Sequence, residues 1–496
     1  MRIAALTAIS GMSDIRLGKK LYSPTSFCDS SAMNTSSSAR WWALLILCAG
    51  TLMIVLDTTI VNVALPSIRT SLGFSPSALA WVVNAYVLTF GGFLLLGGRL
   101  GDLYGHRRLF LIGLTVFTLS SLACGFAWSQ GMLIAARALQ GIGGAIVSAV
   151  SLSLMMNLFT EPEERAKAMG YFGFVAAGGG SVGVLLGGIL TGTFNWHWIF
   201  LVNLPIGILV FLFSLRLLPK AHVRPEAVRL DVAGALLVTA SLMLAVYAIV
   251  NGNEAGWTSV ATLGLLALAV VLLVVFLIVE SRVKDPLIPL HLFKLHNLAV
   301  ANVLGVLWAA AMFASFFLSA LYLQSVLGYT PLQVGLAFLP GNIIMAIFSF
   351  KLSAYLVNRF GIKRPLVIGL ALACLALLLF ARAPVDGHFL LDVLPGMLLI
   401  GIGGGIAFNP MLLAAMQDAS EEESGVASGI VNTSFMMGGA LGLAVLASLA
   451  AYRTASLLAS GSTQINALAS GYHWAFLAGA LCAGAAALGA LLLRTK

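Results

Sequence analysis

The chain has 496 residues, of which 60% are hydrophobic and only 9% are charged, and its mean hydropathy is +1.01. Soluble domains carry about a quarter charged residues. A soluble protein of this length would need several cores covered by charged surfaces, which this composition excludes. We therefore predict an all-α polytopic membrane protein. The formal net charge of +9 requires no nucleic acid, because cytoplasmic loops of membrane proteins are rich in Lys and Arg.

Fourteen apolar runs are long enough for transmembrane helices, each of which needs about 20 largely apolar residues. In chain order they lie near residues 42–65, 78–98, 109–128, 132–157, 167–191, 198–219, 231–250, 259–280, 297–322, 332–357, 365–382, 391–413, 424–449 and 473–493. An even number of spans places both termini on one side of the membrane. When that side is the cytoplasm, it holds most of the 27 Lys and Arg, in agreement with the positive-inside rule.

The segment before the first run, residues 1–41, is polar and rich in Ser. We expect it to be a disordered cytoplasmic tail. Translation from Met33, just before the first run, is an alternative to a start at Met1.

Three motif pairs recur in the same order at an offset of 256 to 260 residues, which indicates an internal repeat. The pairs are the loops 98–108 and 354–364, the glycine clusters 141–144 and 401–404, and the segments 164–183 and 423–442. The repeat predicts an N-terminal six-helix bundle (42–219), a linker with two inserted transmembrane helices (220–296) and a C-terminal six-helix bundle (297–496). Because the matching loops share one face, the repeat is parallel, and a site is expected midway between the bundles.

Two charged residues lie within spans. Asp57 is in the first, and a carboxylate at that depth costs a few kcal/mol unless it is paired, neutral or beside water, so it indicates a functional site. Arg137 in the fourth span also needs a partner, and Asp57 is a candidate. The alternatives are a structural role for Asp57 and a static bridge that only holds the bundle. Asp57 is the only carboxylate that we expect at this depth.

The loop after the second span reads Gly98-Arg-Leu-Gly-Asp102-Leu-Tyr-Gly105-His-Arg107-Arg108. Its glycines permit a tight turn, and its carboxylate can pair with either arginine or favour a helix N-terminus. The pattern predicts a gating latch, and the alternative is an ordinary basic cytoplasmic loop.

The fifth span carries glycines at steps of four residues, at Gly179, Gly183 and Gly187, which let helices approach closely. Tight packing and a moving interface both use such a stripe. The spans contain no nucleophile–base arrangement and no cluster of metal ligands, so we expect neither an enzyme nor a bound metal or cofactor.

Several of these segments resemble motifs of the major facilitator superfamily, in particular its fourteen-span drug:proton antiporters of the EmrB/QacA type. The similar segments are 56–66, 98–108, 137–144, 196–205, 230–234 and 323–329. Two positions depart from the family pattern. Val184 follows Gly183 where the family usually has Pro, and no Arg closely follows Asn432.

The resemblance implies a proton-coupled efflux transporter that exports amphipathic drugs or toxic small molecules by alternating access across the inner membrane of a bacterium. Asp57 would carry the proton or meet a cationic substrate, Arg137 would tune that site, and the glycine stripe would form the moving interface. The expected partners are the substrate, protons and the lipid bilayer, and a periplasmic adaptor is left open. The alternatives are an exporter of one endogenous metabolite or natural product and a non-transporting membrane sensor.

Apolar, aromatic and neutral polar residues in the second half are the candidate substrate contacts. They are Asn302, Trp308, Phe313, Phe316, Gln324, Asn342, Asn409 and Asn432. Such side chains suit a bulky amphipathic compound held by contact area and a few hydrogen bonds. Because spans 9–14 have no carboxylate at mid-depth, a monocation or a neutral compound is expected rather than a dication.

Overall fold

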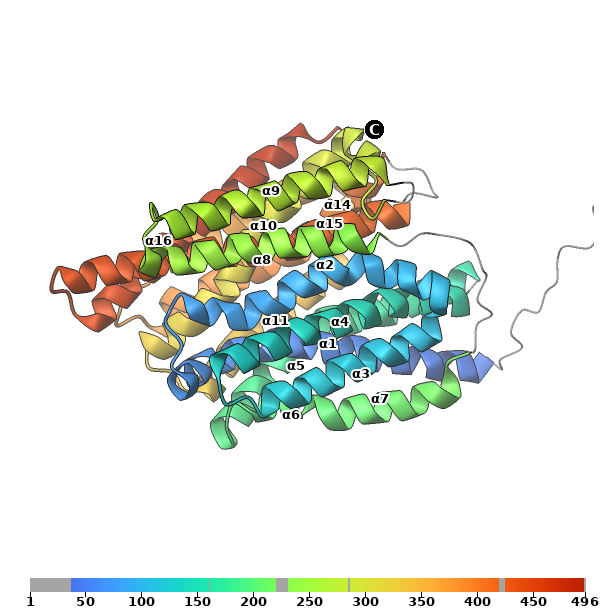
Figure 1. Cartoon of the computed structure of the whole chain (residues 1–496), viewed down its shortest axis with the longest axis horizontal. Coiled ribbons are helices and arrows are strands. Elements are labelled where there is room, and N and C mark those ends of the chain that lie inside the picture. Colours follow the sequence, from blue (N-terminus) through green and yellow to red (C-terminus); the bar gives the residue numbers. More distant parts are fainter. Residues whose placement is uncertain (1–36, 160, 220–230, 284–285, 419–423, 495–496) are drawn as a thin grey trace, which may run out of the picture.

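The computed structural model describes residues 37–159, 161–219, 231–283, 286–418 and 424–494, and within them it has sixteen α-helices and no strand (Figure 1). The first half comprises α1 (Ser37–Leu72), α2 (Trp81–Tyr104), α3 (His106–Gly125), α4 (Gln130–Leu158), α5 (Pro162–Thr193), α6 (Trp198–Leu201) and α7 (Asn203–Leu217). The inserted pair is α8 (Val232–Ala255) and α9 (Val260–Arg282). The second half comprises α10 (His296–Ser325), α11 (Pro331–Ile347), α12 (Ser353–Phe360), α13 (Lys363–Phe380), α14 (Leu394–Met416), α15 (Ser424–Ala459) and α16 (Gln464–Gly489).

Twelve helical stretches in the described part of the chain are long and apolar enough to cross a membrane. The apolar part of α5, Gly178–Thr193, and helix α11 are shorter than the others. In α11 the reason is local, because it passes into a π-helical turn at Phe348–Leu352 before α12 begins. Each of the fourteen predicted runs coincides with a helix, but the total of fourteen spans is not confirmed.

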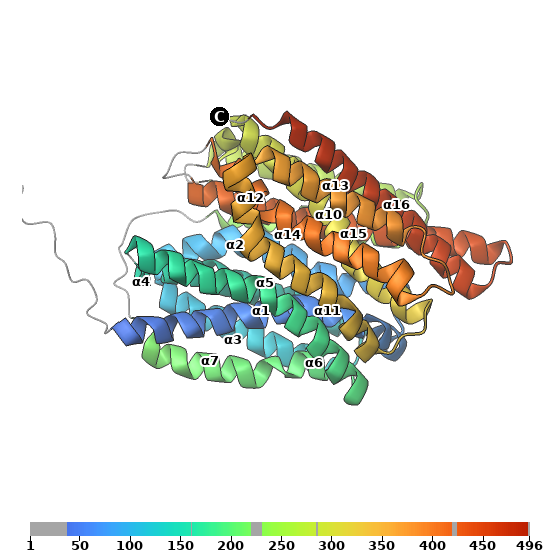
Figure 2. The same cartoon turned by 180° about the vertical axis from the view of Figure 1, so that it is seen from behind.

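The helices form two groups that meet along two seams. Helices α1–α7 pack mainly on one another, as do α10–α16, and the groups touch where α5 meets α11 and where α2 meets α15 (Figures 1 and 2). Helix α8 lies against both α2 and α15, so the inserted pair covers the second seam (Figure 1). Helix α1 begins at Ser37, before the predicted start at residue 42, and the rest of the predicted tail lies outside the described residues. The division at residues 219 and 296 stays a prediction.

Glycines at matching positions of the repeat let matching helices approach closely. A Cβ atom on Gly179 of α5 would lie 2.9 Å from Leu52 of α1, and one on Gly438 of α15 would lie 2.7 Å from Val306 of α10. Real Cβ atoms do not approach other atoms so closely, so a side chain at either position would push the helices apart. Helix α15 thus packs on α10 as α5 packs on α1.

The two copies of the loop motif also turn at matching residues. Gly105, between α2 and α3, has φ 90°, and Gly361, between α12 and α13, has φ 75°. Positive φ is open to glycine without the steric penalty that other residues meet. The glycines on which the repeat is aligned therefore both end a helix.

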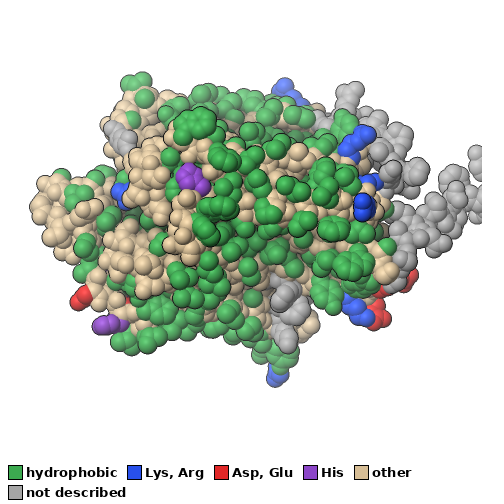
Figure 3. All heavy atoms as spheres, turned by 90° about the horizontal axis from the view of Figure 1, so that it is seen from below, with side chains coloured by type: hydrophobic (Ala, Val, Ile, Leu, Met, Phe, Trp, Pro, Cys, Tyr) green, Lys and Arg blue, Asp and Glu red, His purple; other side chains and the backbone are tan. Residues whose placement is uncertain are grey.

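The surface agrees with a lipid environment. One face of the molecule is covered by hydrophobic side chains, with charged side chains near its margins (Figure 3). Helix α9 has a fully apolar run and exposes large side chains such as Val260, Val270 and Val271. A soluble monomer rarely exposes so extended an apolar surface.

Candidate functional site

Asp57 and Arg137 form an ion pair inside the first half. Their side chains are 0% and 1% exposed, and the Arg137 Nη1 atom donates to Asp57 Oδ2. The same guanidinium donates from Nε to the Val82 carbonyl oxygen at 2.9 Å and from Nη1 to Gln140 Oε1 at 2.8 Å. Removing one member of such a buried pair leaves an uncompensated charge, at a cost of roughly 3–5 kcal/mol. The structure thus pairs Arg137 with Asp57, the partner that the sequence suggests.

The second carboxylate oxygen of Asp57 is bound by two amides. Its Oδ1 atom accepts hydrogen bonds from Gln140 Nε2 at 2.7 Å and from Asn203 Nδ2 at 3.1 Å. Both amides also donate to Ser121 Oγ, at 3.2 and 3.0 Å, and Ser121 donates to the Phe200 carbonyl oxygen at 2.9 Å. The network thus joins α1, α3, α4, α6 and α7, and it holds the carboxylate in one orientation.

An aromatic ring covers the guanidinium. The Arg137 Cζ atom lies 4.4 Å from the ring centroid of Tyr86, which stacks on Phe90 with centroids 5.8 Å apart. Gly144 makes room for this ring, because a Cβ atom there would lie 2.8 Å from the Tyr86 hydroxyl. A cation over an aromatic face is stabilised by about 2 kcal/mol or more when it is desolvated.

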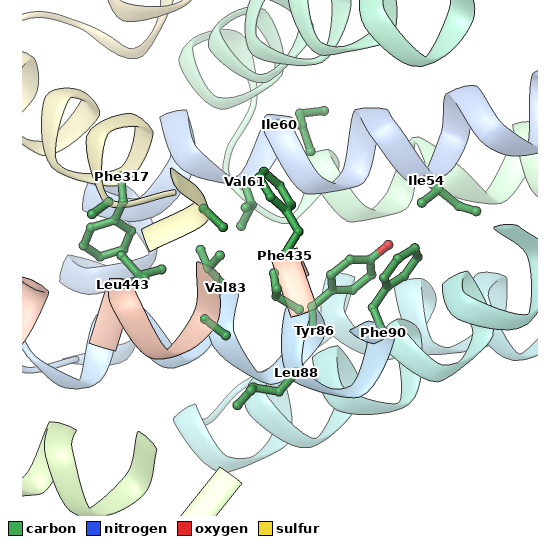
Figure 4. Packing of buried hydrophobic residues seen from close by; sticks show 14 of the residues in the cluster. Ile54, Ile60, Val61, Val83, Tyr86, Leu88, Phe90, Phe317, Phe435 and Leu443 are labelled. Atoms are coloured by element: carbon green, nitrogen blue, oxygen red, sulfur yellow. The ribbon is translucent and has the colours of Figure 1, made fainter. Parts of the chain in front are cut away.

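A cavity of about 270 Å³ lies between the two halves, beside this network. The first half lines it with Val55, Thr58, Thr59, Asn62, Val83, Tyr86, Val87, Arg137 and Gly180. The second half lines it with Met312, Phe313, Phe316, Asn342, Met345, Phe435 and Met436. Figure 4 shows Phe435 of α15 between α1 and α2, near Tyr86. The position agrees with the predicted site midway between the halves, and the volume is near the lower end of the usual range for ligand pockets, roughly 300–1,000 Å³.

Three predicted substrate residues line this cavity, namely Phe313, Phe316 and Asn342. Trp308 and Asn432 do not. Trp308 is buried, with one of its ring atoms 3.4 Å from where a Cβ of Gly404 would lie.

The other three predicted substrate residues bond to backbone outside the cavity wall. Asn302 Nδ2 donates to the Leu298 carbonyl oxygen of its own helix at 2.8 Å. Asn409 Nδ2 donates to the Ser349 carbonyl oxygen at 2.9 Å. Gln324 Nε2 donates to the Val63 carbonyl oxygen of α1 at 2.9 Å, so it joins the two halves.

Apart from Arg137, the residues of the first half that line the cavity were not predicted from the sequence, nor were the two amides around Asp57. Gln140 lies three residues after Arg137, on the same helix face, and this spacing was an available signal. Asn203 is a polar residue within an apolar run, which is the same kind of signal. The contribution of Thr58 and Asn62 follows from their spacing on one face of α1, because four residues complete about one helical turn.

The loop motif is only partly described. Gly98 lies against α4, where a Cβ atom would be 4.0 Å from Ala149, and Gly105 makes the turn into α3. Arg107 donates to the Leu215 carbonyl oxygen of α7, within the first half, and Arg108 is exposed. The side chain of Asp102 lies outside the described residues, so its predicted pairing stays a prediction.

The glycine stripe of α5 faces α1. Cβ atoms on Gly183 and Gly187 would lie 3.1 Å from the Leu56 and 2.7 Å from the Ile60 carbonyl oxygens. The close approach to the second half is made by the next residue, Gly188, where a Cβ atom would lie 2.7 Å from the Pro331 carbonyl oxygen of α11. The stripe therefore packs α5 inside its own half.

No group of three or more His, Cys, Asp or Glu side chains in the described ranges is arranged to hold a metal ion.

Comparison with known proteins agrees with this architecture. Residues 47–443 match the model of the Major Facilitator Superfamily. The puromycin resistance protein pur8 of Streptomyces alboniger is 40% identical over 447 residues, which is 89% of this chain and 88% of that protein. The cephamycin export protein CmcT of Amycolatopsis lactamdurans is 39% identical over 414 residues, which is 83% of this chain and 85% of that one.

A solved structure shows the same fold. The crystal structure of an auto-inhibited POT family peptide transporter has a TM-score of 0.65 and 16% sequence identity, and the match covers 92% of this chain and 98% of that one. The family model and the drug-resistance and export proteins among the relatives confirm the resemblance to this superfamily, and the chain belongs to the Major Facilitator Superfamily.

Proposed function

We propose that the protein is a proton-coupled efflux transporter that exports amphipathic small molecules, including antibiotics, across the inner membrane of a bacterium. Both termini would lie in the cytoplasm. The observation that carries the proposal is the buried Asp57–Arg137 pair beside the cavity between the halves. Arg137 is part of the cavity wall. Its relatives are named for puromycin resistance and cephamycin export, which supports an outward direction of transport.

Asp57 is the proposed proton carrier. In the described state its carboxylate has an ion-pair partner and two amide donors. Protonation would remove the attraction to Arg137 and weaken each of these bonds. A network that loses its charge in this way would couple proton binding to the packing of six helices, because Arg137 also bonds to Val82 of α2.

The cavity supports an amphipathic substrate. Methionine and phenylalanine side chains of the second half give apolar contact area, and Thr58, Asn62 and Asn342 offer hydrogen bonds. Its one charged wall residue, Arg137, is already paired. We therefore propose a neutral or singly charged substrate.

Alternating access would act at the seams between the halves. On one side of the cavity, Gly188 packs against Pro331 and Gln324 bonds to the Val63 carbonyl oxygen. Opening this side requires these contacts to break. The loop residues Asp102, Arg107 and Arg108 would act as the latch on the opposite, cytoplasmic side.

The second candidate is export of one natural product made by the cell itself. The name of the cephamycin export protein favours it. A susceptibility panel with cells that have or lack the protein separates the two, because a multidrug exporter protects against several unrelated compounds.

The experiment that tests the proposal is transport in proteoliposomes with an imposed pH gradient. The wild-type protein should accumulate substrate against its concentration gradient. The Asp57→Asn variant should still insert, because its side chain keeps the size and polarity of the original, although Arg137 loses its counter-ion, so the proteins are compared at matched levels. It should not drive uphill transport, since its side chain cannot bind and release a proton. Asp57→Glu should keep partial activity with a shifted pH optimum.

Glu163→Gln is the matched control, because Glu163 forms an exposed pair with Lys167 on α5 and should leave transport unchanged. Uphill, proton-driven transport by the Asp57→Asn variant would show that Asp57 has a structural role. Absence of any transport by the wild type would favour the sensor alternative.

A further inference from the structure

Two more carboxyl groups are buried where the inserted pair meets the first half. Asp231 precedes α8 and Glu280 lies in the last turn of α9, and these residues are 7% and 3% exposed. Asp231 lies in the family-like segment 230–234, for which no role is predicted, and nothing in the sequence marks Glu280. Both lie near the ends of their helices, away from Asp57.

Each carboxyl group uses one oxygen to bind backbone. Asp231 Oδ1 accepts from the Gly234 amide at 2.7 Å and so caps the N-terminus of α8. Glu280 Oε2 accepts from the Ile288 amide at 3.1 Å, in the segment that follows α9. These bonds fix the orientation of both side chains.

The remaining oxygens, Asp231 Oδ2 and Glu280 Oε1, are buried and accept no hydrogen bond from the described residues. Both face the α-carbon of Gly234. A Cβ atom there would lie 2.8 Å from Glu280 Oε1 and would clash with Asp231 Oδ2. Both free oxygens therefore border the same small space beside Gly234 and face one another across it. Both oxygens are hydrogen-bond acceptors when ionised, so they can bond to each other only if one of them carries a hydrogen.

No described cation neutralises the pair. Arg99 of α2 donates to the Pro286 carbonyl oxygen at 3.4 Å, and Arg282 at the end of α9 is exposed. Helix α15 presents Met437 to α8 and α9. The charged residues of 220–230 and 284–285 lie outside the described residues.

We propose that Asp231 and Glu280 bind one proton between Oδ2 and Oε1, as a site separate from Asp57. Two carboxylates in contact and removed from water do not both ionise, because each disfavours the charge on the other. A shared proton satisfies both free oxygens and halves the buried charge.

The bound proton also holds the segment after α9 in place. Leu287 packs against Leu96 of α2 and Ala235 of α8. The next residue, Ile288, is the one whose amide donates to Glu280. Release of the proton would force the two like charges apart and loosen this contact. The site would therefore link the protonation of the inserted pair to its attachment to α2, the helix that leads into the loop motif.

Infrared difference spectroscopy on the purified full chain tests the proposal. The Asp57→Asn protein is the parent, so that the signal of Asp57 is absent. At neutral pH it should show the carbonyl band of a protonated carboxyl group that shifts in D₂O. Glu280→Gln and Asp231→Asn should each lose that band, and Glu163→Gln should keep it. A parent without the band, or a band that remains in both variants, would overturn the proposal.

Thermal stability against pH provides a second readout. A proton bound in the folded state stabilises at low pH, and this stabilisation is lost as the pH rises and the proton leaves. The parent should therefore lose stability at alkaline pH, and Glu280→Gln, whose amide keeps a donor between the oxygens, should lose less. Equal pH dependence of the two proteins would contradict a shared proton. If the Glu280→Gln variant does not fold, the Asp231→Asn variant replaces it in both the infrared and the thermal-stability measurement.

Discussion

The guanidinium carbon of Arg137 lies 4.4 Å from the ring centroid of Tyr86, and both residues line the cavity between the halves. One aromatic ring therefore belongs to the charge network and to the surface that a substrate would meet. A substrate that presses on this ring acts directly on the environment of the Asp57–Arg137 pair. The contact offers a short physical route between substrate binding and proton binding.

The Tyr86 ring should matter more than its hydroxyl. The hydroxyl is buried and has no hydrogen-bond partner in the described part of the chain, so Tyr86→Phe should transport at close to the wild-type rate. Tyr86→Ala removes the cation–π contact, about 2 kcal/mol, and uncovers the ion pair. It should leak protons in proteoliposomes without substrate, as measured with an internal pH dye. A leak from the Phe variant equal to that of the Ala variant would contradict this assignment.

Arg137 and Asp57 should depend on each other for the stability of the fold, because they form a buried ion pair. Arg137→Met leaves a buried carboxylate without its cation, and we expect a loss of roughly 3–5 kcal/mol in stability. The double variant with Asp57→Asn removes both charges and should recover part of that loss. The measurement is a double-mutant cycle of thermal unfolding in detergent. Additive effects of the two substitutions would show that the residues do not interact.

The stripe glycine Gly183 should not tolerate alanine. The added Cβ atom would clash with Thr59 and lie 3.1 Å from the Leu56 carbonyl oxygen, so α5 would have to move away from α1. We expect a loss of about 1–3 kcal/mol. Gly178, on the same helix, has no atom within 4 Å of a Cβ position, so Gly178→Ala is the matched control and should be neutral or stabilising. Equal thermal stability of the two variants would show that the stripe is not tightly packed.

Reporter fusions should settle the number of spans. Fusions after residues 104, 224 and 360 should report the cytoplasm, and fusions after 254 and 387 should report the opposite side. Residue 254 lies in the last turn of α8, just before α9, and both helices are long enough to cross the membrane. A cytoplasmic signal after residue 254 would remove the inserted pair from the transmembrane count and reduce the predicted fourteen spans to twelve.

The helices could be predicted from sequence because a bilayer demands long apolar runs, and such runs are visible in one dimension. The pairing of Asp57 with Arg137 was accessible for a similar reason, since few charges lie in the apolar spans and each needs a partner. Glu280 was missed because it lies at the end of a span, where a charge normally reaches water. In the structure it is buried beside Gly234 of α8, near Leu287, which packs on α2 and α8.

The cavity wall was harder to predict. Successive residues of a helix point about 100° apart, so a small rotation of a helix decides which side chains face the cavity. Phe313 and Phe316 face it, whereas Trp308 on the same helix packs against α14. The amides of Asn302 and Asn409 bond to nearby backbone carbonyl oxygens, a local use that their sequence context does not distinguish from ligand binding.

The two walls of the cavity differ in composition. This difference would separate the residues that choose the substrate from those proposed to bind the proton. The first half contributes Arg137, hydroxyl and amide groups and three valines, whereas the second half contributes three methionines and three phenylalanines with a single amide, that of Asn342. Methionine side chains are flexible and tolerate substitution. Under the proposed function, mutations on that wall would change which compound is accepted and leave the Asp57–Arg137 pair untouched. Resistance to a new antibiotic would then need only a few apolar substitutions in one half of the gene.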